Sequence, residues 1–482
     1  MFVHKADCLA GIPYEINYIT IRKKSQQPEQ ILTLMARYGK PKKMNHLRRN
    51  HAIPVAIRHV LWYNIGNIIC PEVLRMNTSF AHNPLLPDRY FIPDVEAHVW
   101  ADGRIYLYGS RDVPGNPGYC SDEYHVFSSD DLVNWIDHGV SFRLDQAKWY
   151  TGGTRALYAP DCAFRDGTYY LYYCVPDGRC GVARSDSPTG PFEDVGVIDG
   201  ITGIDPAVLI DDDGQAYIYW GQFDGVRAAR LRDNMTEIIP ESVTQPLSVA
   251  EHDFHEGSSV KKIDGLYYFV YTDTHRHKSP AHSYGMATCL GYAVSENPMS
   301  GFRYGGVIID NLGCDPGTWN NHGSICAFRG QWYVFYHRST HGFEFSRHVC
   351  AEPISVADGH IGEVPLTSSG VGGGIPADAY IPASLACGLT GHARIKGETD
   401  ESGAYALFLG ELRPGDAAVF RYIDFDGESK LHIDLKGEGQ PAVGVLIDGK
   451  PAEGAVSGRH EVTLTFGGDF SDAAVRGFTF VK

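Results

Sequence analysis

A short glycine-led phrase occurs five times along this chain and constrains its fold more than any other feature. Each phrase opens with a turn glycine and continues as a run of apolar and aromatic residues, a composition that favours β-strands. The glycines lie 64, 47, 51 and 65 residues apart, and they are Gly103, Gly167, Gly214, Gly265 and Gly330. A β-rich unit repeated at this spacing is typical of a propeller blade. We therefore predict an all-β fold, a five-bladed β-propeller.

Carboxylate residues lie at a constant distance upstream of three of these glycines. Asp94, Asp205 and Glu256 each stand nine residues before the glycine of their repeat. A hairpin joins each upstream segment to the glycine-led run, so the upstream segment is expected to be the innermost strand of its blade. Because innermost strands line the central channel of a propeller, we predict that the three carboxylates converge on one axial site.

The second and fifth repeats differ at the equivalent position. The second repeat has the stretch from Tyr158 to Asp161, and the fifth has His322, eight residues before its glycine. A histidine here is either a hydrogen-bonded core residue or an axial metal ligand, and spacing alone does not decide between them. None of the other histidines forms the HExxH pair of a zinc helix.

Three carboxylates around a dry channel suit the hydrolysis of glycosidic bonds. One must be protonated to give a proton to the leaving oxygen, and another must be ionised to activate water. A third can tune the first by charge repulsion. Taken singly, Asp94 and Asp205 could cap proline turns and Glu256 could lie on a solvated face, but their shared offset favours a joint site.

Charge and cysteine content exclude several functions. The net charge of −16 argues against a nucleic-acid partner, because neutralising phosphates requires clustered Lys and Arg. The sequence has no apolar run of the roughly 20 residues that span a bilayer, so no membrane partner is expected. The 11 cysteines are scattered, which favours a reducing compartment. With no signal-peptide pattern at the N-terminus, we predict a cytoplasmic protein.

Composition also suggests three segments. Residues 1–75 hold 12 Lys and Arg against 4 Asp and Glu and carry no repeat. We expect this basic extension to lie outside the natural folded unit, the alternative being a targeting or docking arm. Residues 76–370 form the predicted propeller. Residues 371–482 begin with a glycine-rich linker and continue as short alternating strands, which indicates a β-sandwich.

At the carboxylate positions the sequence resembles glycoside hydrolase family 43, whose fold is a five-bladed propeller. The resemblance covers residues 83–370. It rests on Pro93–Glu96 (PDVE), Gly203–Gly214 (GIDPAVLIDDDG) and Phe254–Gly257 (FHEG). The family pattern has proline where this chain has Val95.

The resemblance implies a role for each candidate residue. It makes Asp94 the general base, Glu256 the general acid and Asp205 the residue that orients the acid and modulates its pKa. Arg347 is similar to a late arginine that reaches the substrate. The resemblance further implies that Tyr158 and Asp161 bind substrate, and that His322 lies near a calcium ion or its waters.

The expected activity is that of an inverting exo-glycosidase. Its substrates would be terminal pentosyl residues of plant cell-wall oligosaccharides, as for an α-L-arabinofuranosidase or a β-xylosidase. No cofactor is expected to be required, although a structural Ca2+ fits the resemblance. The C-terminal sandwich resembles carbohydrate-binding modules, and it either binds glycan or only supports the propeller. The alternatives are a propeller glycosidase acting on galactan or arabinan, and a non-catalytic glycan-binding propeller.

Overall fold

A computed structural model of the chain describes residues 17–22, 31–36, 80–277, 280–282, 285–315, 318–401 and 403–482. The chain divides into two compact units, Met1–Ile69 and Cys70–Lys482. In the first unit, β1 (Asn17–Arg22) pairs antiparallel with β2 (Ile31–Ala36). The rest of the basic extension lies outside the described residues, so the expectation for residues 1–75 stays a prediction.

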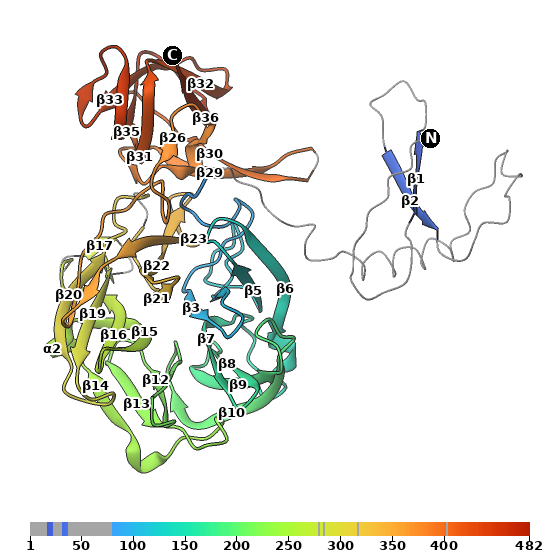
Figure 1. Cartoon of the computed structure of the whole chain (residues 1–482), viewed down its shortest axis with the longest axis vertical. Coiled ribbons are helices and arrows are strands. Elements are labelled where there is room, and N and C mark those ends of the chain that lie inside the picture. Colours follow the sequence, from blue (N-terminus) through green and yellow to red (C-terminus); the bar gives the residue numbers. More distant parts are fainter. Residues whose placement is uncertain are drawn as a thin grey trace, which may run out of the picture. The chain divides into compact units, whose positions relative to one another are not determined.

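Five consecutive sheets form most of the second unit, one for each glycine-led repeat (Figure 1). Four of them have four strands and the fifth has three. The strands of the first two sheets are β3 (Glu96–Val99), β4 (Ile105–Tyr108), β5 (Glu123–Ser129), β6 (Trp135–Arg143), β7 (Tyr158–Arg165), β8 (Thr168–Cys174), β9 (Arg179–Ser185) and β10 (Glu193–Thr202). Those of the other three are β11 (Ala207–Ile210), β12 (Ala216–Trp220), β13 (Val226–Arg230), β14 (Thr244–Leu247), β15 (Phe254–Ile263), β16 (Leu266–Asp273), β19 (Cys289–Ser295), β20 (Arg303–Ile309), β21 (Ser324–Phe328), β22 (Gln331–Thr340) and β23 (Phe343–Ile354).

The first strand of each sheet lies at the centre of a ring. Strands β3, β7, β11, β15 and β21 contact one another in this order, and β21 contacts β3 again. Each forms a hairpin with the next strand, as predicted. The turn glycines all have φ between +76° and +84°, a left-handed conformation that costs other residues energy, which explains why glycine recurs there. The all-β prediction is confirmed.

The N-terminal segment of the propeller closes the ring against the last sheet. Leu85 N donates to Val349 O over 2.9 Å, and Ala351 N donates to the side-chain oxygen of Asn83 over 2.9 Å. The Asn83 amide nitrogen in turn donates to Ala351 O and to Glu352 Oε1. The three-stranded sheet thereby gains a neighbour along β23, and the first and last sheets are joined.

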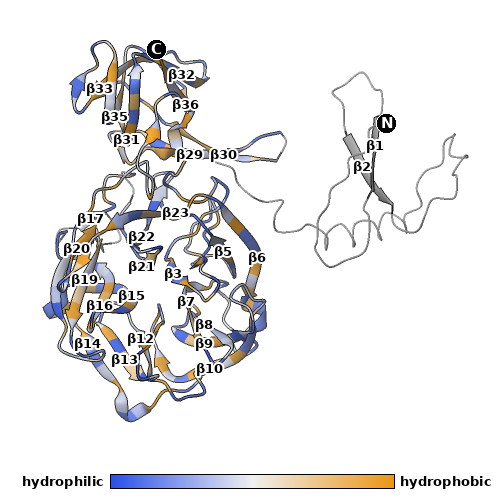
Figure 2. Ribbon diagram, in the orientation of Figure 1, coloured by the Kyte–Doolittle hydropathy of each residue, from blue (hydrophilic) through white to orange (hydrophobic). Residues whose placement is uncertain are grey.

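Buried aromatic residues fill the space between neighbouring blades. One cluster joins the first two sheets and includes Tyr108, Tyr124, Phe142, Tyr173 and Phe192. Tyr108 is 1% exposed, and its hydroxyl donates to Pro188 O of the next blade over 2.7 Å. Such residues bury apolar area while their polar atoms stay hydrogen-bonded. Figure 2 shows hydrophobic residues on the strands of both the ring and the C-terminal domain.

The C-terminal domain consists of two further sheets around one core. They comprise β26 (Ile375–Pro376), β27 (Ile381–Pro382), β28 (Gly388–Leu389), β29 (Arg394–Thr399), β30 (Tyr405–Gly410), β31 (Ala417–Glu428), β32 (Lys430–Gly437), β33 (Ala442–Ile447), β34 (Lys450–Pro451), β35 (Val456–Gly467) and β36 (Ala473–Val481). Phe420 and Phe425 on β31 meet Phe478 and Phe480 on β36 in this core. Phe91 of the propeller joins the same cluster, and Asp88 Oδ2 accepts from Leu407 N over 2.8 Å.

The remaining elements are short. They are β17 (Pro280–His282), β18 (Gly285–Met286), β24 (Val356–Ala357), β25 (His360–Ile361), α2 (Val249–His252) and the 3-10 turns at Leu144–Gln146, Pro240–Ser242 and Ala383–Leu385. Within the described residues, no helix has the length and apolar character needed to cross a bilayer. Every cysteine in this part of the chain is a buried free thiol.

Candidate active site

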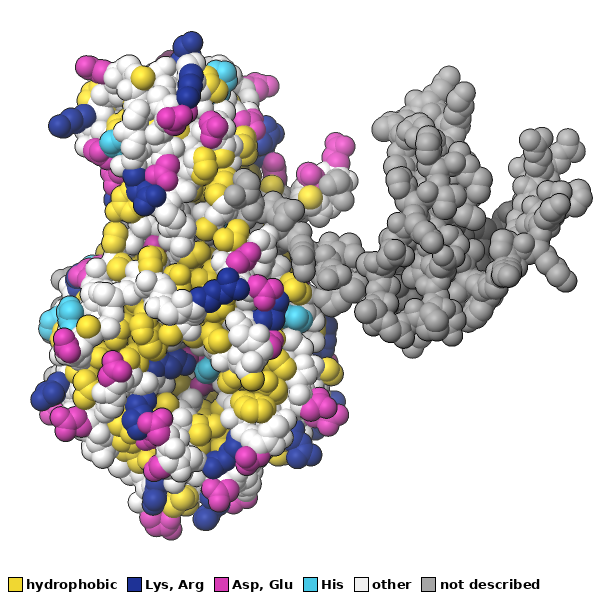
Figure 3. All heavy atoms as spheres, in the orientation of Figure 1, with side chains coloured by type: hydrophobic (Ala, Val, Ile, Leu, Met, Phe, Trp, Pro, Cys, Tyr) yellow, Lys and Arg dark blue, Asp and Glu magenta, His cyan; other side chains and the backbone are white. Residues whose placement is uncertain are grey.

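The three predicted carboxylates stand at the same end of the inner strands. Asp94 precedes β3 and Asp205 precedes β11, and both have φ of +56°. Aspartate is among the residues that adopt this left-handed conformation most readily. Glu256 is the third residue of β15. All three are at most 9% exposed. Seen in Figure 3, the face of the ring is hollowed near its centre, where charged and histidine side chains show.

His322 lies close to two of the three carboxylates in this hollow. Its Nδ1 lies 3.8 Å from Asp94 Oδ1 and 3.9 Å from Asp205 Oδ2. Asp205 Oδ2 also accepts the backbone N–H of Gly257, the residue after Glu256, over 3.1 Å. The structure therefore brings Asp94, Asp205, Glu256 and His322 together, although they come from four different blades.

Asp94 is held in its ionised form by a buried arginine. Burial alone would raise the pKa of Asp94, but the charge of Arg347 together with His322, His337 and a hydrogen bond from Ser110 outweighs burial and lowers the pKa. Arg347 Nη1 donates to Asp94 Oδ1 over 2.7 Å, and its Nε and Nη2 donate to the two oxygens of Asp112 over 2.8 and 3.0 Å. Arg347 is only 2% exposed. Its nitrogens thus face protein carboxylates, and the contact with substrate that the resemblance implies for this residue stays a prediction.

The pKa of Asp205, which lies next to Glu256, is shifted in the opposite direction from that of Asp94. Burial and then the nearby charge of Glu256 raise the pKa of Asp205 well above its ordinary value. Asp205 therefore keeps its proton to a higher pH than an isolated aspartate does. The N–H of Gly257, which donates to Asp205 Oδ2, only partly opposes this effect. Glu256 Oε2 is in turn hydrogen-bonded to Gln222 Nε2 over 2.6 Å.

His322 packs against the residue that follows the acid. A Cβ on Gly257 would lie 2.9 Å from Nε2 and Cδ2 of His322, and the φ of Gly257 is +69°. Burial lowers the pKa of His322, so the ring is neutral at pH 7. His322 belongs to no group of three or more potential metal ligands among the described residues. A Ca2+ ion beside it would need several oxygen ligands, which water molecules can supply.

The sequence analysis did not single out three residues near the active site on the second strands of their sheets. Cys174, Thr272 and His337 each lie seven residues after a turn glycine, so the repeat itself carried a signal for them. Cys174 Sγ accepts the N–H of Asp205 over 3.3 Å, and Thr272 Oγ1 donates to Asn321 O over 2.6 Å. His337 Nδ1 lies 3.6 Å from Asp94 Oδ1. Asp112 and Gln222 had no such signal.

Tyr158 and Asp161 separate in the structure. Tyr158 occupies the position nine residues before its glycine, and burial raises its pKa to about 12, with Asp205 among the nearby charges. Asp161 lies further along β7 and contacts none of the three carboxylates through a hydrogen bond. Its oxygens accept from Val208 N over 2.6 Å and bind His98 Nε2 over 2.7 Å.

A second charged layer surrounds Asp161. Glu96 accepts hydrogen bonds from Lys261 Nζ and, over 3.1 Å, from Ser259 Oγ. Burial raises the pKa of Glu96 to about 7, against the lowering effect of Lys261. Because Lys261 comes from β15 and Glu96 from β3, this ion pair crosses the channel between the fourth blade and the first.

A ring of β-sheets whose axis holds an arginine-bound carboxylate beside a buried Asp–Glu pair is the architecture of a glycoside hydrolase. The chain belongs to glycosyl hydrolases family 43, whose family model matches residues 81–361.

Similar proteins agree with this assignment. The chain is 34% identical over 351 residues to a xylosidase/arabinosidase of Thermoclostridium stercorarium, covering 64% of this chain and 72% of that protein. It is also similar to the calcium-free crystal structure of CoXyl43, a β-xylosidase/α-arabinofuranosidase from a compost microbial metagenome, in complex with xylotriose. That likeness has a TM-score of 0.52 and 30% identity, and it covers 61% of this chain and 99% of CoXyl43.

A third likeness extends beyond the propeller. The arabinoxylan arabinofuranohydrolase of Bacillus subtilis has a TM-score of 0.50 and 24% identity, covering 84% of this chain and 100% of that structure. At this level of identity the likeness concerns the fold alone.

Proposed function

We propose that this enzyme removes terminal pentosyl residues from xylan-type oligosaccharides, with inversion of the anomeric carbon. The observation that carries the proposal is the contrast between neighbouring carboxyl groups at one end of the channel. Arg347 favours the ionised form of Asp94, while burial and the nearby charge of Glu256 favour the protonated form of Asp205. Such a contrast suits Asp94 for the role of base and the Asp205–Glu256 pair for the supply of a proton.

Asp94 then acts as the general base. Its Oδ2 is free of the Arg347 contact, which is made by Oδ1. An ionised oxygen in that position accepts a proton from water as the water attacks the anomeric carbon. The buried setting keeps other water away from the reacting bond.

Glu256 acts as the general acid. It gives its proton to the glycosidic oxygen as the bond to the anomeric carbon breaks, so that the leaving sugar departs as an alcohol. Asp205 holds the Gly257 backbone next to the acid, and its carboxyl and that of Glu256 repel each other when both are charged.

The proposed class of sugar is inferred from the names of similar proteins. The relative from T. stercorarium is named for both xylosidase and arabinosidase activity, and CoXyl43 was solved with xylotriose. Pentosyl units of xylan are therefore the substrates that we propose, and the structure favours neither arabinofuranoside nor xyloside.

Leaving-group dependence tests the two roles separately. We expect Glu256→Ala to lose far more activity on xylobiose or arabinosyl-xylobiose than on a dinitrophenyl pentoside, because the activated phenol leaves without protonation. Asp94→Ala should lose activity on both substrates by about 1,000-fold or more. Equal losses of Glu256→Ala on both substrates would contradict the assignment of the acid.

The stereochemical course provides an independent check. We expect proton NMR of an early reaction mixture to show the anomer opposite to that of the substrate as the first product. A first product of unchanged configuration would mean that a carboxylate attacks the sugar directly, and the proposed role of Asp94 as base would be wrong.

A further inference from the structure

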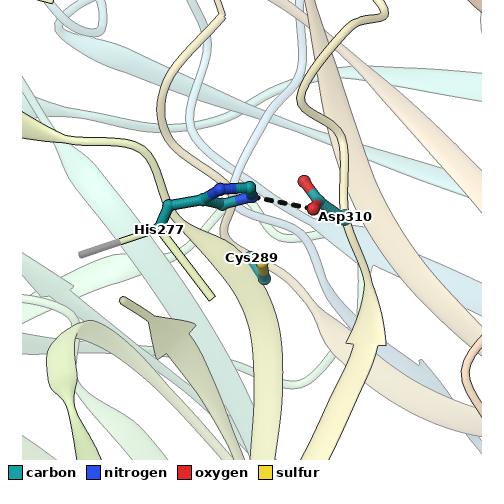
Figure 4. Close-up of side chains that lie close together, drawn as sticks. All are labelled: His277, Cys289 and Asp310. Atoms are coloured by element: carbon teal, nitrogen blue, oxygen red, sulfur yellow. Dashed lines mark hydrogen bonds and ion pairs between the residues drawn. The ribbon is translucent and has the colours of Figure 1, made fainter. Parts of the chain in front are cut away.

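A second cluster of chemically reactive side chains lies outside the carboxylate site. His277 follows β16, Cys289 begins β19 and Asp310 follows β20, so three neighbouring positions of the fourth sheet bring them together. One donor atom from each lies within 4.8 Å of the other two. Figure 4 shows the imidazole and the carboxylate facing each other, with the Cys289 side chain beside them. His277 Nε2 and Asp310 Oδ2 are 2.8 Å apart.

These three donor types form a ligand set that Zn2+ prefers. Zinc takes imidazole nitrogen, thiolate sulfur and carboxylate oxygen at about 2.0–2.3 Å, and three protein ligands with one water are common. Tetrahedral coordination at those lengths requires a small widening of the 2.8 Å contact between His277 and Asp310. The Cys289 side chain is fully buried, whereas His277 and Asp310 remain 21% and 18% exposed. Ions can therefore reach the cluster from solvent.

The charges around the cluster also favour a cation. Arg276 lies 3.3 Å from Asp310 Oδ2, but its guanidinium is engaged by both oxygens of Glu363 over 2.7 and 2.8 Å. Asp310 and Glu363 together carry one more charge than the single guanidinium. A divalent ion that displaces the proton of the Cys289 thiol neutralises that excess. The Glu96–His98–Asp161 group differs, because Lys261 already contributes a positive charge there.

We propose that His277, Cys289 and Asp310 bind a divalent transition-metal ion, with Zn2+ the best match and a water molecule as the fourth ligand. As the sulfur–metal bond forms, the Cys289 thiol releases its proton to solvent, and no oxidation or reduction occurs. The site is distinct from His322 and does not depend on the proposed hydrolytic roles.

The contacts of a neighbouring residue give the ion a structural role. Thr288, next to Cys289, donates from its N–H to Trp319 O over 2.7 Å, and its Oγ1 accepts the N–H of Asn321 over 2.9 Å. Asn321 precedes His322. A bound ion therefore stabilises the start of β19 and, through Thr288, the backbone that carries His322 into the active site.

Cobalt substitution of the full-length protein tests the site directly. After removal of bound metal by a chelator and dialysis, Co2+ alone is added and the absorption spectrum is recorded. We expect one equivalent to produce a thiolate-to-cobalt charge-transfer band in the near ultraviolet, which added Zn2+ abolishes. Cys289→Ser should lose this band, while the matched control Cys180→Ser, which removes a buried thiol on β9, should keep it. Absence of the band in the unmodified protein, or its persistence in Cys289→Ser, would overturn the proposal.

A variant of the partly exposed ligand His277 tests the site without disturbing the core, where Cys289→Ser could impair folding. His277→Gln should weaken Zn2+ binding by at least roughly 10- to 100-fold. It should also abolish the rise in melting temperature that Zn2+ produces in the unmodified enzyme. His275→Gln is its control, since His275 pairs with Asp253 over 2.7 Å and lies outside the cluster. Unchanged Zn2+ affinity in His277→Gln would overturn the proposal.

Discussion

Arg347 and Asp94 are joined by a hydrogen bond of 2.7 Å between Nη1 and Oδ1. The same guanidinium donates two further hydrogen bonds to the carboxylate of Asp112. The Arg347–Asp94 contact joins the fifth blade to the first, and its two residues are 253 positions apart in the chain. It is the largest of the contributions that together lower the pKa of the buried Asp94. Arg347 is therefore a positioning residue for the proposed base, and its effect should be visible in the pH dependence of the enzyme.

Replacement of Arg347 should move the acid limb of the pH profile. In Arg347→Met, Asp94 loses its cation while it stays buried, so its pKa rises and activity is lost already at a higher pH. We expect the acid limb of kcat/KM to shift upward by about one pH unit or more. Arg179→Met is the control, because Arg179 pairs with Asp177 on an exposed turn. An acid limb at the original pH would contradict the coupling.

Asp205→Asn should stabilise the protein while it impairs catalysis. The folded state raises the pKa of Asp205 above its unfolded value, so the folded state binds more protons and loses stability as the pH rises from about 3.8. Asparagine keeps an acceptor for Gly257 but has no charge to repel Glu256 and Asp94. We expect a gain of about 1 kcal/mol or more at pH 7.

Denaturant unfolding across pH provides the measurement for Asp205→Asn. The difference from the unmodified enzyme should be small near pH 4 and should grow toward pH 7. A variant that is less stable than the unmodified enzyme at pH 7 would contradict the repulsion inferred here.

Two adjacent lysines should respond differently to substitution. Lys261 pairs with the buried Glu96 inside the channel, whereas Lys262 pairs with Asp211 and the exposed Asp212. Lys261→Met leaves an uncompensated buried carboxylate and should cost roughly 3 kcal/mol of unfolding free energy. Lys262→Met should cost no more than about 1 kcal/mol. If urea unfolding showed equal losses of unfolding free energy in the two variants, the Lys261–Glu96 pair would contribute no more to stability than the surface pair.

Gly257→Ala should impair both folding and turnover. The new Cβ would meet the His322 ring at 2.9 Å, and the positive φ adds strain. Gly265→Ala is a matched control, since its φ is +83° but nothing lies within 4 Å of the added Cβ. The control should lose about 1 kcal/mol from backbone strain alone. Gly257→Ala should lose more, together with a fall in kcat, and similar kinetics in the two variants would refute the contact.

The sequence also indicated how deep each residue lies in the channel. Asp94, Asp205, Glu256 and Tyr158 share the nine-residue offset, while Asp161 lies only six residues before its glycine. Each residue along a strand advances about 3.3 Å. Three residues therefore carry Asp161 well beyond the carboxylate ring, into the layer that holds His98 and Glu96. The substrate-binding roles of Tyr158 and Asp161 stay predictions.

The sequence by itself determined the repeating hairpins, the all-β fold and the offsets of Asp94, Asp205 and Glu256, because turn glycines and strand periodicity are local properties. Only the tertiary structure decided that Arg347 serves Asp94 and Asp112, that Lys261 crosses the channel to Glu96, and that His277, Cys289 and Asp310 meet. These contacts join residues whose separation in sequence is unrelated to the repeat. Their partners depend on how the blades close around an axis and on which buried charges must be compensated there.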